Sequence, residues 1–105
     1  MKLPEDPIVL ELLPEFVETW LTDIEQYHEF ETKNQASELY RMAHTLKGSC
    51  YQFGLDDLGD MGIEMMTYAK ISDWAKAAVL KQKIKSRFLE VDDYLINHNI
   101  VLSQR

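Results

Sequence analysis

This sequence has few of the residues that break or crosslink a chain. Its 105 residues include four glycines, three prolines and one cysteine, and all three prolines lie within the first fourteen residues. A single cysteine, Cys50, excludes an intramolecular disulfide and favours a reducing compartment. No apolar run approaches the length of a transmembrane helix, and the charges and prolines near the N-terminus argue against a signal peptide. We therefore expect a cytoplasmic chain that does not contact a membrane.

Sustained strand-like alternation, internal repeats and low-complexity segments are also absent from the sequence. Hydrophobic residues make up 46% of the chain and charged residues 28%, which is typical of a soluble globular protein. A chain of this length suits one domain with a single core that needs neither metal nor disulfides. With so few helix breakers, the sequence predicts one all-α domain spanning residues 1–105.

The net charge of -7 is unevenly distributed along the chain. Residues 1–39 hold ten of the eighteen acidic side chains, whereas five basic residues cluster after Trp74: Lys76, Lys81, Lys83, Lys85 and Arg87. This basic stretch follows a helical pattern without interleaved aromatic residues. A solvated helix face is the better interpretation, since the acidic remainder of the chain would repel a phosphate backbone. We expect no nucleic-acid partner.

Apolar residues recur at helical spacing in four long segments. The first runs from Pro14 to about Phe30, after a short N-terminal helix over Ile8 to Leu12. The second runs from about Gln35 to Phe53 and ends at Gly54. The third, capped by Asp56 or Asp57, carries the apolar stripe Leu58, Gly62, Met65 and Ala69. The fourth, capped by Ser72 or Asp73, runs from Trp74 to about Asn97. Short connections predict an antiparallel up-and-down four-helix bundle with a short additional N-terminal helix.

The second of these segments has two faces with different chemistry. Its apolar stripe includes Leu46, Cys50 and Phe53. A polar strip at spacing i, i+3, i+4 and i+7 consists of His44, Lys47, Gly48 and Tyr51. A glycine inside a helix costs on the order of 1 kcal/mol relative to alanine. Because Gly48 lies on the solvent side, the close approach of a ligand or partner would explain it better than core packing.

The polar strip suits phosphoryl transfer. A neutral imidazole such as that of His44 has a ring-nitrogen lone pair and needs no general base to attack a phosphoryl group. Phosphoryl transfer depends mainly on positioning and charge compensation. Lys47, one helical turn away, can neutralise a phosphoryl oxygen, and Gly48 leaves room for the phosphoryl group and its donor.

The motif from His44 to Cys50, followed by Phe53 and Gly54, resembles the signature of histidine phosphotransfer (HPt) domains of two-component phosphorelays. The resemblance extends over the whole chain, because that family folds as an up-and-down four-helix bundle with an exposed histidine in mid-helix. It implies that His44 is the phosphoacceptor and that Lys47 and Gly48 shape the site. The small size of the chain is similar to that of bacterial stand-alone members. An excised module of a larger kinase would have the same sequence features.

The resemblance also implies the partners. The donor would be the receiver domain of a hybrid sensor histidine kinase, and the acceptor would be the receiver domain of a response regulator. The chain would act as a monomeric carrier that binds no cofactor, with Mg²⁺ supplied by the receiver. It lacks a Gly-rich phosphate loop, so we expect a phosphotransfer carrier rather than an ATP-dependent kinase.

A strip on the third helix could border the same site if that helix packs antiparallel to the second. It consists of Gly59, Ile63, Met66 and Lys70. Together with Tyr51, the first three would form a surface for docking a partner, and methionine adapts well to several partners. Lys70 resembles a basic residue that some HPt domains carry near the phosphoryl group, although it equally fits an ordinary exposed helix charge.

Two other classes of function remain open. One is a helical interaction module that binds receiver domains without carrying phosphate, for which His44 would be dispensable. The other is a cofactor-binding bundle, which would need ligands that face inward. A metal site is not expected, because three scattered histidines and one cysteine do not converge at ligand spacing. His28 and His98 are interpreted as surface or helix-end residues, and Cys50 as a buried packing residue.

Overall fold

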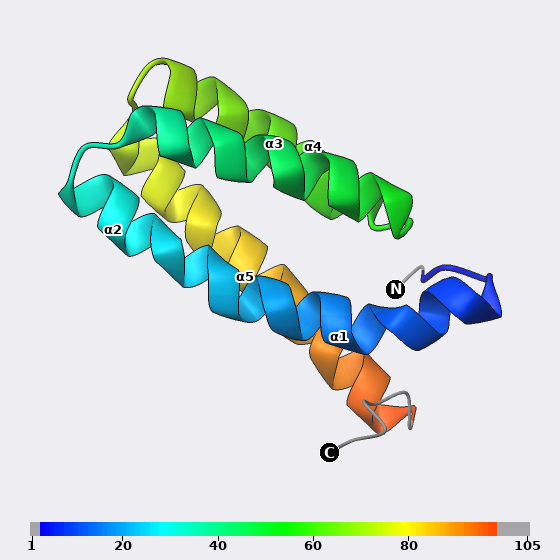
Figure 1. Cartoon of the computed structure of the whole chain (residues 1–105). Coiled ribbons are helices and arrows are strands. Elements are labelled where there is room, and N and C mark those ends of the chain that lie inside the picture. The colour runs from blue at the N-terminus through cyan, green and yellow to red at the C-terminus, as the bar shows by residue number, and fades with distance from the viewer. Residues whose placement is uncertain (1–2, 99–105) are drawn as a thin grey trace.

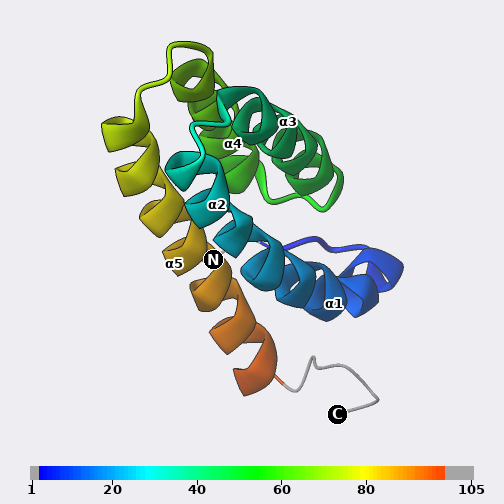
Figure 2. The same ribbon diagram turned by 60° about the vertical axis from the view of Figure 1, so that its left-hand side comes forward.

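A computed structural model describes residues 3–98, and within that range every regular element is helical. The first rod of the bundle consists of α1 (Pro7–Asp23), the 3₁₀ helix η1 (Ile24–Gln26) and α2 (Tyr27–Thr32), which continue one another in Figure 1. The other three rods are α3 (Ala36–Gln52), α4 (Asp56–Lys70) and α5 (Trp74–Asn97). Successive rods run in opposite directions, as Figures 1 and 2 show, so the predicted up-and-down four-helix bundle is confirmed.

The first rod differs from the sequence prediction at its beginning. No separate short helix precedes Pro14, because α1 starts at Pro7 and continues through Pro14, which is buried in its interior. The earlier start has a local cause: the Asp6 carboxylate accepts a hydrogen bond from the backbone N–H of Ile8 at 2.9 Å, and Pro7 occupies the first turn. A proline can follow inside the helix at the cost of one backbone hydrogen bond, which tertiary packing here offsets.

A left-handed glycine ends α3 as predicted. Gly54 has φ 75°, a backbone conformation that a residue without Cβ adopts readily. The N–H of Leu55 then donates to the carbonyl of Cys50 at 2.9 Å, and the N–H of Gly54 donates to that of Tyr51 at 3.1 Å. These two bonds satisfy carbonyls that the end of a helix otherwise leaves unpaired. The chain therefore reverses within a few residues, and α4 returns beside α3.

The capping predictions for the last two helices have different outcomes. Asp73 caps α5, since its carboxylate accepts from the N–H of Lys76 at 3.1 Å. The prediction that Asp56 or Asp57 caps α4 is wrong. Both aspartates lie inside its first turn, where their charges face the positive end of the helix dipole, and Leu55 occupies the cap position.

The core lies between all four rods. The stripe predicted for α5 is confirmed, because Ala77, Leu80, Ile84, Phe88, Val91 and Leu95 are all buried. Trp20 of α1 stacks on Phe88, with ring centroids 6.2 Å apart. At the end of the bundle where α2 turns into α3, the indole N–H of Trp74 donates to the side chain of Asn34 at 2.9 Å. Both tryptophans therefore anchor the bundle, one in its centre and one at the α2–α3 turn.

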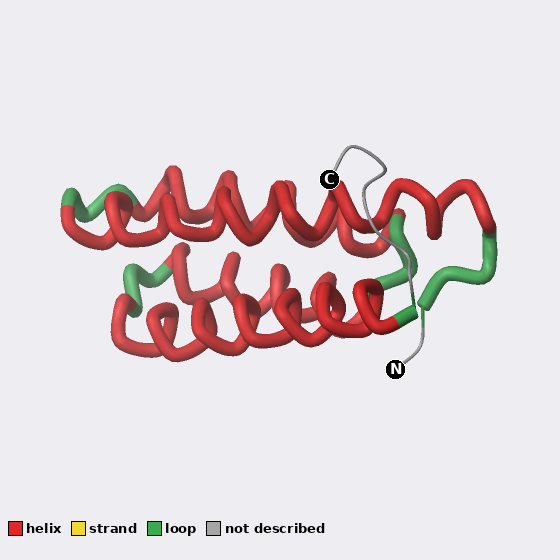
Figure 3. Tube along the Cα trace, turned by 90° about the horizontal axis from the view of Figure 1, so that it is seen from below, coloured by secondary structure: helices red, strands yellow, loops and turns green. Residues whose placement is uncertain are grey.

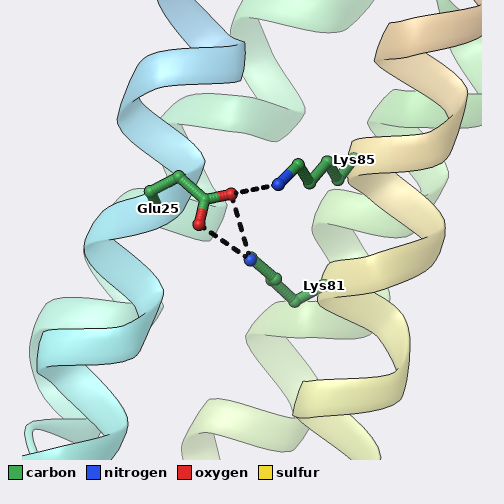
Figure 4. Close-up of polar contacts among 3 residues, drawn as sticks. All are labelled: Glu25, Lys81 and Lys85. Carbon is green, nitrogen blue, oxygen red and sulfur yellow. Dashed lines mark hydrogen bonds and ion pairs between the residues drawn. The ribbon is translucent and has the colours of Figure 1, made fainter.

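One charged residue of α5 is buried and has a partner across the bundle. The ammonium of Lys81 donates to both carboxylate oxygens of Glu25 in η1, at 3.1 and 3.2 Å, and Lys85 pairs with the same carboxylate at 2.8 Å (Figure 4). Lys81 is only 7% exposed, whereas Glu25 is half exposed. The hydrogen bonds from Lys85 and Lys81 hold the pKa of the Glu25 carboxyl below its ordinary value.

Because the folded state lowers the pKa of Glu25, this contact stabilises the fold at neutral pH and loses its effect in acid. Replacing Glu25 by Gln should lower the free energy of unfolding by about 1 kcal/mol at pH 7, discounted for the exposure of the carboxylate. The difference between the two proteins should shrink as pH falls through the lowered pKa of Glu25. Urea unfolding of both proteins at pH 7 and pH 3 measures this difference in the free energy of unfolding. Glu29→Gln, at an exposed pair with Lys33 on the same rod, is the control and should have little effect at either pH. An equal loss at both pH values for Glu25→Gln would contradict the charge-based account.

Candidate functional site

The predicted phosphoacceptor lies on the outer surface of α3. His44 is exposed, and so are Gly48 and Tyr51 further along the same helix. Lys47 is half-buried, with its backbone turned toward α4. Leu46 and Cys50 on the opposite face are buried in the core. The structure therefore places the four residues of the strip on one side of α3, between its solvent face and its contact with α4.

Gly48 leaves the surface beside His44 open. Among residues 3–98, a Cβ atom placed on Gly48 would have no atom of another part of the protein within 4 Å. No packing contact inside the chain therefore requires a glycine at this position. A side chain there would instead extend into the space next to the imidazole, because residues four apart are neighbours on a helix surface. The surface next to the imidazole is therefore open to another molecule.

A second glycine sets the distance between α3 and α4. A Cβ atom on Gly62 would lie 2.8 Å from the backbone nitrogen and 2.9 Å from the Cα of Lys47, which is closer than real Cβ atoms approach. The two helices therefore meet backbone to backbone at this point. They lie side by side in Figure 1, and Figure 3 shows the helices of the bundle lying lengthwise beside one another. This contact positions Lys47, the residue that provides positive charge one turn from His44.

The contact between Lys47 and Gly62 also sets which residues of α4 lie level with His44. Moving one turn back along α3 to His44 corresponds to moving one turn forward along antiparallel α4, which reaches Met66. Met66 is half-buried, and Ile63 is 46% exposed. Lys70 is exposed one further turn along, level with Tyr40 of α3. By this register Met66 is expected level with His44, and Lys70 about one turn further along α4.

Gly59 does not lie on the exposed strip where the sequence placed it. It is buried beneath the ring of Tyr51, and a Cβ atom there would lie 2.4 Å from Cε1 of that ring. The Tyr51 hydroxyl donates to Asp60 Oδ1 at 2.6 Å, so the ring crosses from α3 onto α4. A partner cannot touch Gly59 in this arrangement. The prediction that Gly59 is part of the exposed docking surface is therefore wrong. Gly59 instead packs against the ring of Tyr51.

Sequence reasoning did not single out Arg41, which the structure places one turn before His44. Its side chain is 78% exposed and makes only a long contact with Glu38, at 3.9 Å. Arg41 and Lys47 therefore lie three residues before and three residues after the histidine. The i, i+3 spacing could have identified Arg41, since residues three apart share a helix surface.

The remaining chemistry-bearing side chains are not arranged as a second site. Cys50 is completely buried, and burial together with the nearby charge of Asp57 raises the pKa of its thiol to about 12. A thiol of that kind is inert at neutral pH. Among residues 3–98 no group of three or more histidine, cysteine or carboxylate side chains could hold a metal ion. In the same range, no helix is both long and apolar enough to cross a lipid bilayer.

The exposure of His44 bears on the alternative of a cofactor-binding bundle. Such a bundle holds its ligand with side chains that project inward between facing helices. His44 lies on the outer surface, as do His28 and His98. None of the three histidines is therefore placed to ligate a group inside the bundle.

The family model described as the Hpt domain matches residues 11–94 of this chain, a range that runs from the second turn of α1 to Tyr94 in α5 and so includes part or all of each rod. Neither the curated proteins nor the solved structures gave a match.

Proposed function

This chain belongs to the Hpt domain family, whose function is histidine phosphotransfer in phosphorelays, and on that premise we propose that His44 is its phosphoacceptor. The phosphoryl group would come from the phosphorylated aspartate of a receiver domain in a hybrid sensor histidine kinase. It would pass on to the aspartate of a response-regulator receiver. The chain would act as a monomeric carrier in the cytoplasm and bind no cofactor of its own.

The observation that carries this proposal is the open surface at His44. The imidazole is exposed, and the neighbouring Gly48 leaves unobstructed space for a donor. In the transfer, a ring nitrogen of His44 forms a bond to phosphorus while the phosphorus–oxygen bond to the donor aspartate breaks. The donor carboxylate leaves with the bonding pair, and onward transfer reverses these steps at a second receiver.

Charge compensation supports the assignment of Lys47. Because its backbone packs against Gly62, the start of its side chain has a defined position one turn from His44, and the ammonium can reach a phosphoryl oxygen. The receiver would supply Mg²⁺, which neutralises charge on the phosphoryl group during transfer. Met66, which the register places level with His44, and Ile63, three residues before it on α4, would contribute apolar contacts to the receiver. Lys70, one turn further, would add positive charge to the edge of this surface.

Labelling tests the proposed function. The chain is mixed with Mg²⁺ and with receiver domains from its own genome, each phosphorylated with ³²P. We expect rapid transfer to this chain from at least one receiver. The label should be lost in acid and stable in base, as a phosphorus–nitrogen bond requires. Absence of label from every receiver would overturn the carrier function and favour a module that binds receivers without carrying phosphate.

Replacing Lys47 by alanine should slow the transfer about 10- to 100-fold, since one charge-compensating group is lost from the transition state. The fold should persist, because the backbone contact with Gly62 does not depend on the lysine side chain. Single-turnover transfer from the best receiver measures the rate. Lys70→Ala is the matched control, and it should have a smaller effect because Lys70 lies a turn further from His44. An equal loss in the two variants would contradict the special position of Lys47.

A further inference from the structure

Tyr51 is an exposed aromatic residue whose ring and hydroxyl both contact α4. The residue remains 37% exposed, yet one side of its ring lies against α4 at Gly59 and its hydroxyl donates a hydrogen bond to Asp60. The hydrogen bond to Asp60 and partial burial raise the pKa of the phenol to about 12. The hydroxyl is therefore committed to a contact within the chain, and the ring surface is what Tyr51 presents to solvent.

The ring packs against position 59 of α4, where only glycine leaves enough space for it. Any side chain at position 59 would overlap Cε1, Cδ1 and Cζ of Tyr51, all within 2.7 Å of an ideal Cβ. A rigid aromatic side chain loses little conformational entropy when a partner covers it. Ile63, 46% exposed, lies one turn from Gly59 on the same side of α4. Tyr51 and Ile63 together form an apolar surface that continues from the His44 strip.

We propose that Tyr51 is a fixed aromatic anchor for the receiver domain, positioned by its hydrogen bond to Asp60 and by the packing of its ring against Gly59. The inference rests on the proposed function, because it takes the receiver as the occupant of this surface. Tyr51 follows His44 by seven residues, which places it about 10 Å along α3. It therefore contacts the receiver away from the reacting atoms and determines how tightly, and in which orientation, the receiver binds.

The surroundings of Tyr51 define the chemistry of the matching receiver surface. The carboxylates of Asp56 and Asp60 lie close enough to the ring to raise the pKa of its phenol. An apolar side chain with a lysine or arginine beside it complements this combination of ring and negative charge. On the receiver, this pair lies about 10 Å from the phosphorylated aspartate, as Tyr51 does from His44.

The first test separates binding from chemistry. Tyr51→Ala should raise the KM for the best phosphorylated receiver about tenfold or more, with little change in kcat. Labelling of His44 by phosphoramidate, a small donor without a docking surface, should stay unchanged. Gln52→Ala, an exposed neighbour at the end of α3, is the matched control for KM. An unchanged KM in Tyr51→Ala would overturn the anchor role, whereas a wild type that accepts no phosphoryl group from receivers would instead overturn the proposed function.

The second test asks whether Gly59 and Asp60 act through Tyr51. Gly59→Ala adds a methyl group beneath the ring and should raise the KM as Tyr51→Ala does, although the tyrosine remains in the chain. Tyr51→Phe and Asp60→Asn should each raise the KM, and the double variant no more than Tyr51→Phe alone, because both act on the same hydrogen bond: Phe removes its donor and Asn leaves only an uncharged acceptor. Ring NMR resonances should show the pKa of Tyr51 falling toward its ordinary value in Asp60→Asn. Additive effects, or an unchanged KM in Gly59→Ala with the fold intact, would overturn the positioning role.

Discussion

Replacing His44 by glutamine should abolish phosphoryl acceptance from every receiver domain while leaving the free energy of unfolding nearly unchanged. Glutamine retains polar atoms of similar reach, but its amide nitrogen has no available lone pair with which to attack phosphorus. Because His44 is exposed and contributes nothing to the buried core, its replacement should not disturb α3. The measurements are ³²P transfer from the best receiver and urea unfolding.

The other histidines provide the controls for this experiment. His28 lies exposed on α2 and His98 follows the end of α5. His28→Gln and His98→Gln should accept phosphoryl groups at the wild-type rate. His44→Gln could retain acid-labile label that is lost when His28→Gln or His98→Gln is added. That result would identify another histidine as the acceptor and contradict the assignment of His44. Binding of the receiver to His44→Gln should persist, because the apolar contacts on α4 are unaffected.

The second large effect is expected at Gly62, on the stability of the bundle. A methyl group at this position would lie 2.8 Å from the backbone nitrogen of Lys47, so α3 and α4 must move apart to admit it. Overpacking of this kind costs about 1–3 kcal/mol, and the better helix propensity of alanine returns up to about 1 kcal/mol. Gly62→Ala should therefore lower the free energy of unfolding, and Gly62→Val should lower it further. The shift also moves Lys47, so the rate of transfer should fall as well.

Gly48→Ala is the matched control for this prediction. Both glycines lie inside helices, but a Cβ atom on Gly48 meets nothing within 4 Å. This change should raise the free energy of unfolding by about 0.5–1 kcal/mol through helix propensity alone. Urea unfolding of the two alanine variants compares them directly. Equal stabilisation in both would show that α3 and α4 do not need the close contact at Gly62.

Periodicity predicted the core well because each helix buries a single stripe. All of the apolar positions expected on α5 are buried, and Leu39, Ala43, Leu46 and Cys50 of α3 are buried too. The start of α1 was harder to predict, because either Pro7 or Pro14 could lie in the first turn of a helix. Because Asp6 caps the helix, Pro7 lies in its first turn. Burial of the following turns stabilises the helix, so that it continues past Pro14. Such a choice depends on tertiary packing rather than on a local signal.

The candidate site shows the same limit in its side chains. The spacing of His44, Lys47 and Gly48 placed them correctly on one side of α3, because that relation belongs to a single helix. The burial of Gly59 depends on a tyrosine that reaches across from a neighbouring helix. Periodicity within α4 contains no information about that ring. The distance of Lys70 from His44 likewise depends on the register between α3 and α4, which the contact at Gly62 sets.

The openness at Gly48 also has a kinetic consequence. A surface open to a receiver would be equally open to water, because no other part of the described chain lies within 4 Å of a Cβ atom at this position. Once phosphorylated, His44 would be shielded only while a partner covers it. The lifetime of the unbound phosphorylated chain would then be set by the intrinsic hydrolysis of the phosphorus–nitrogen bond. How far a signal travels would depend on whether the carrier meets its next partner within that lifetime, and therefore on the concentration of that partner.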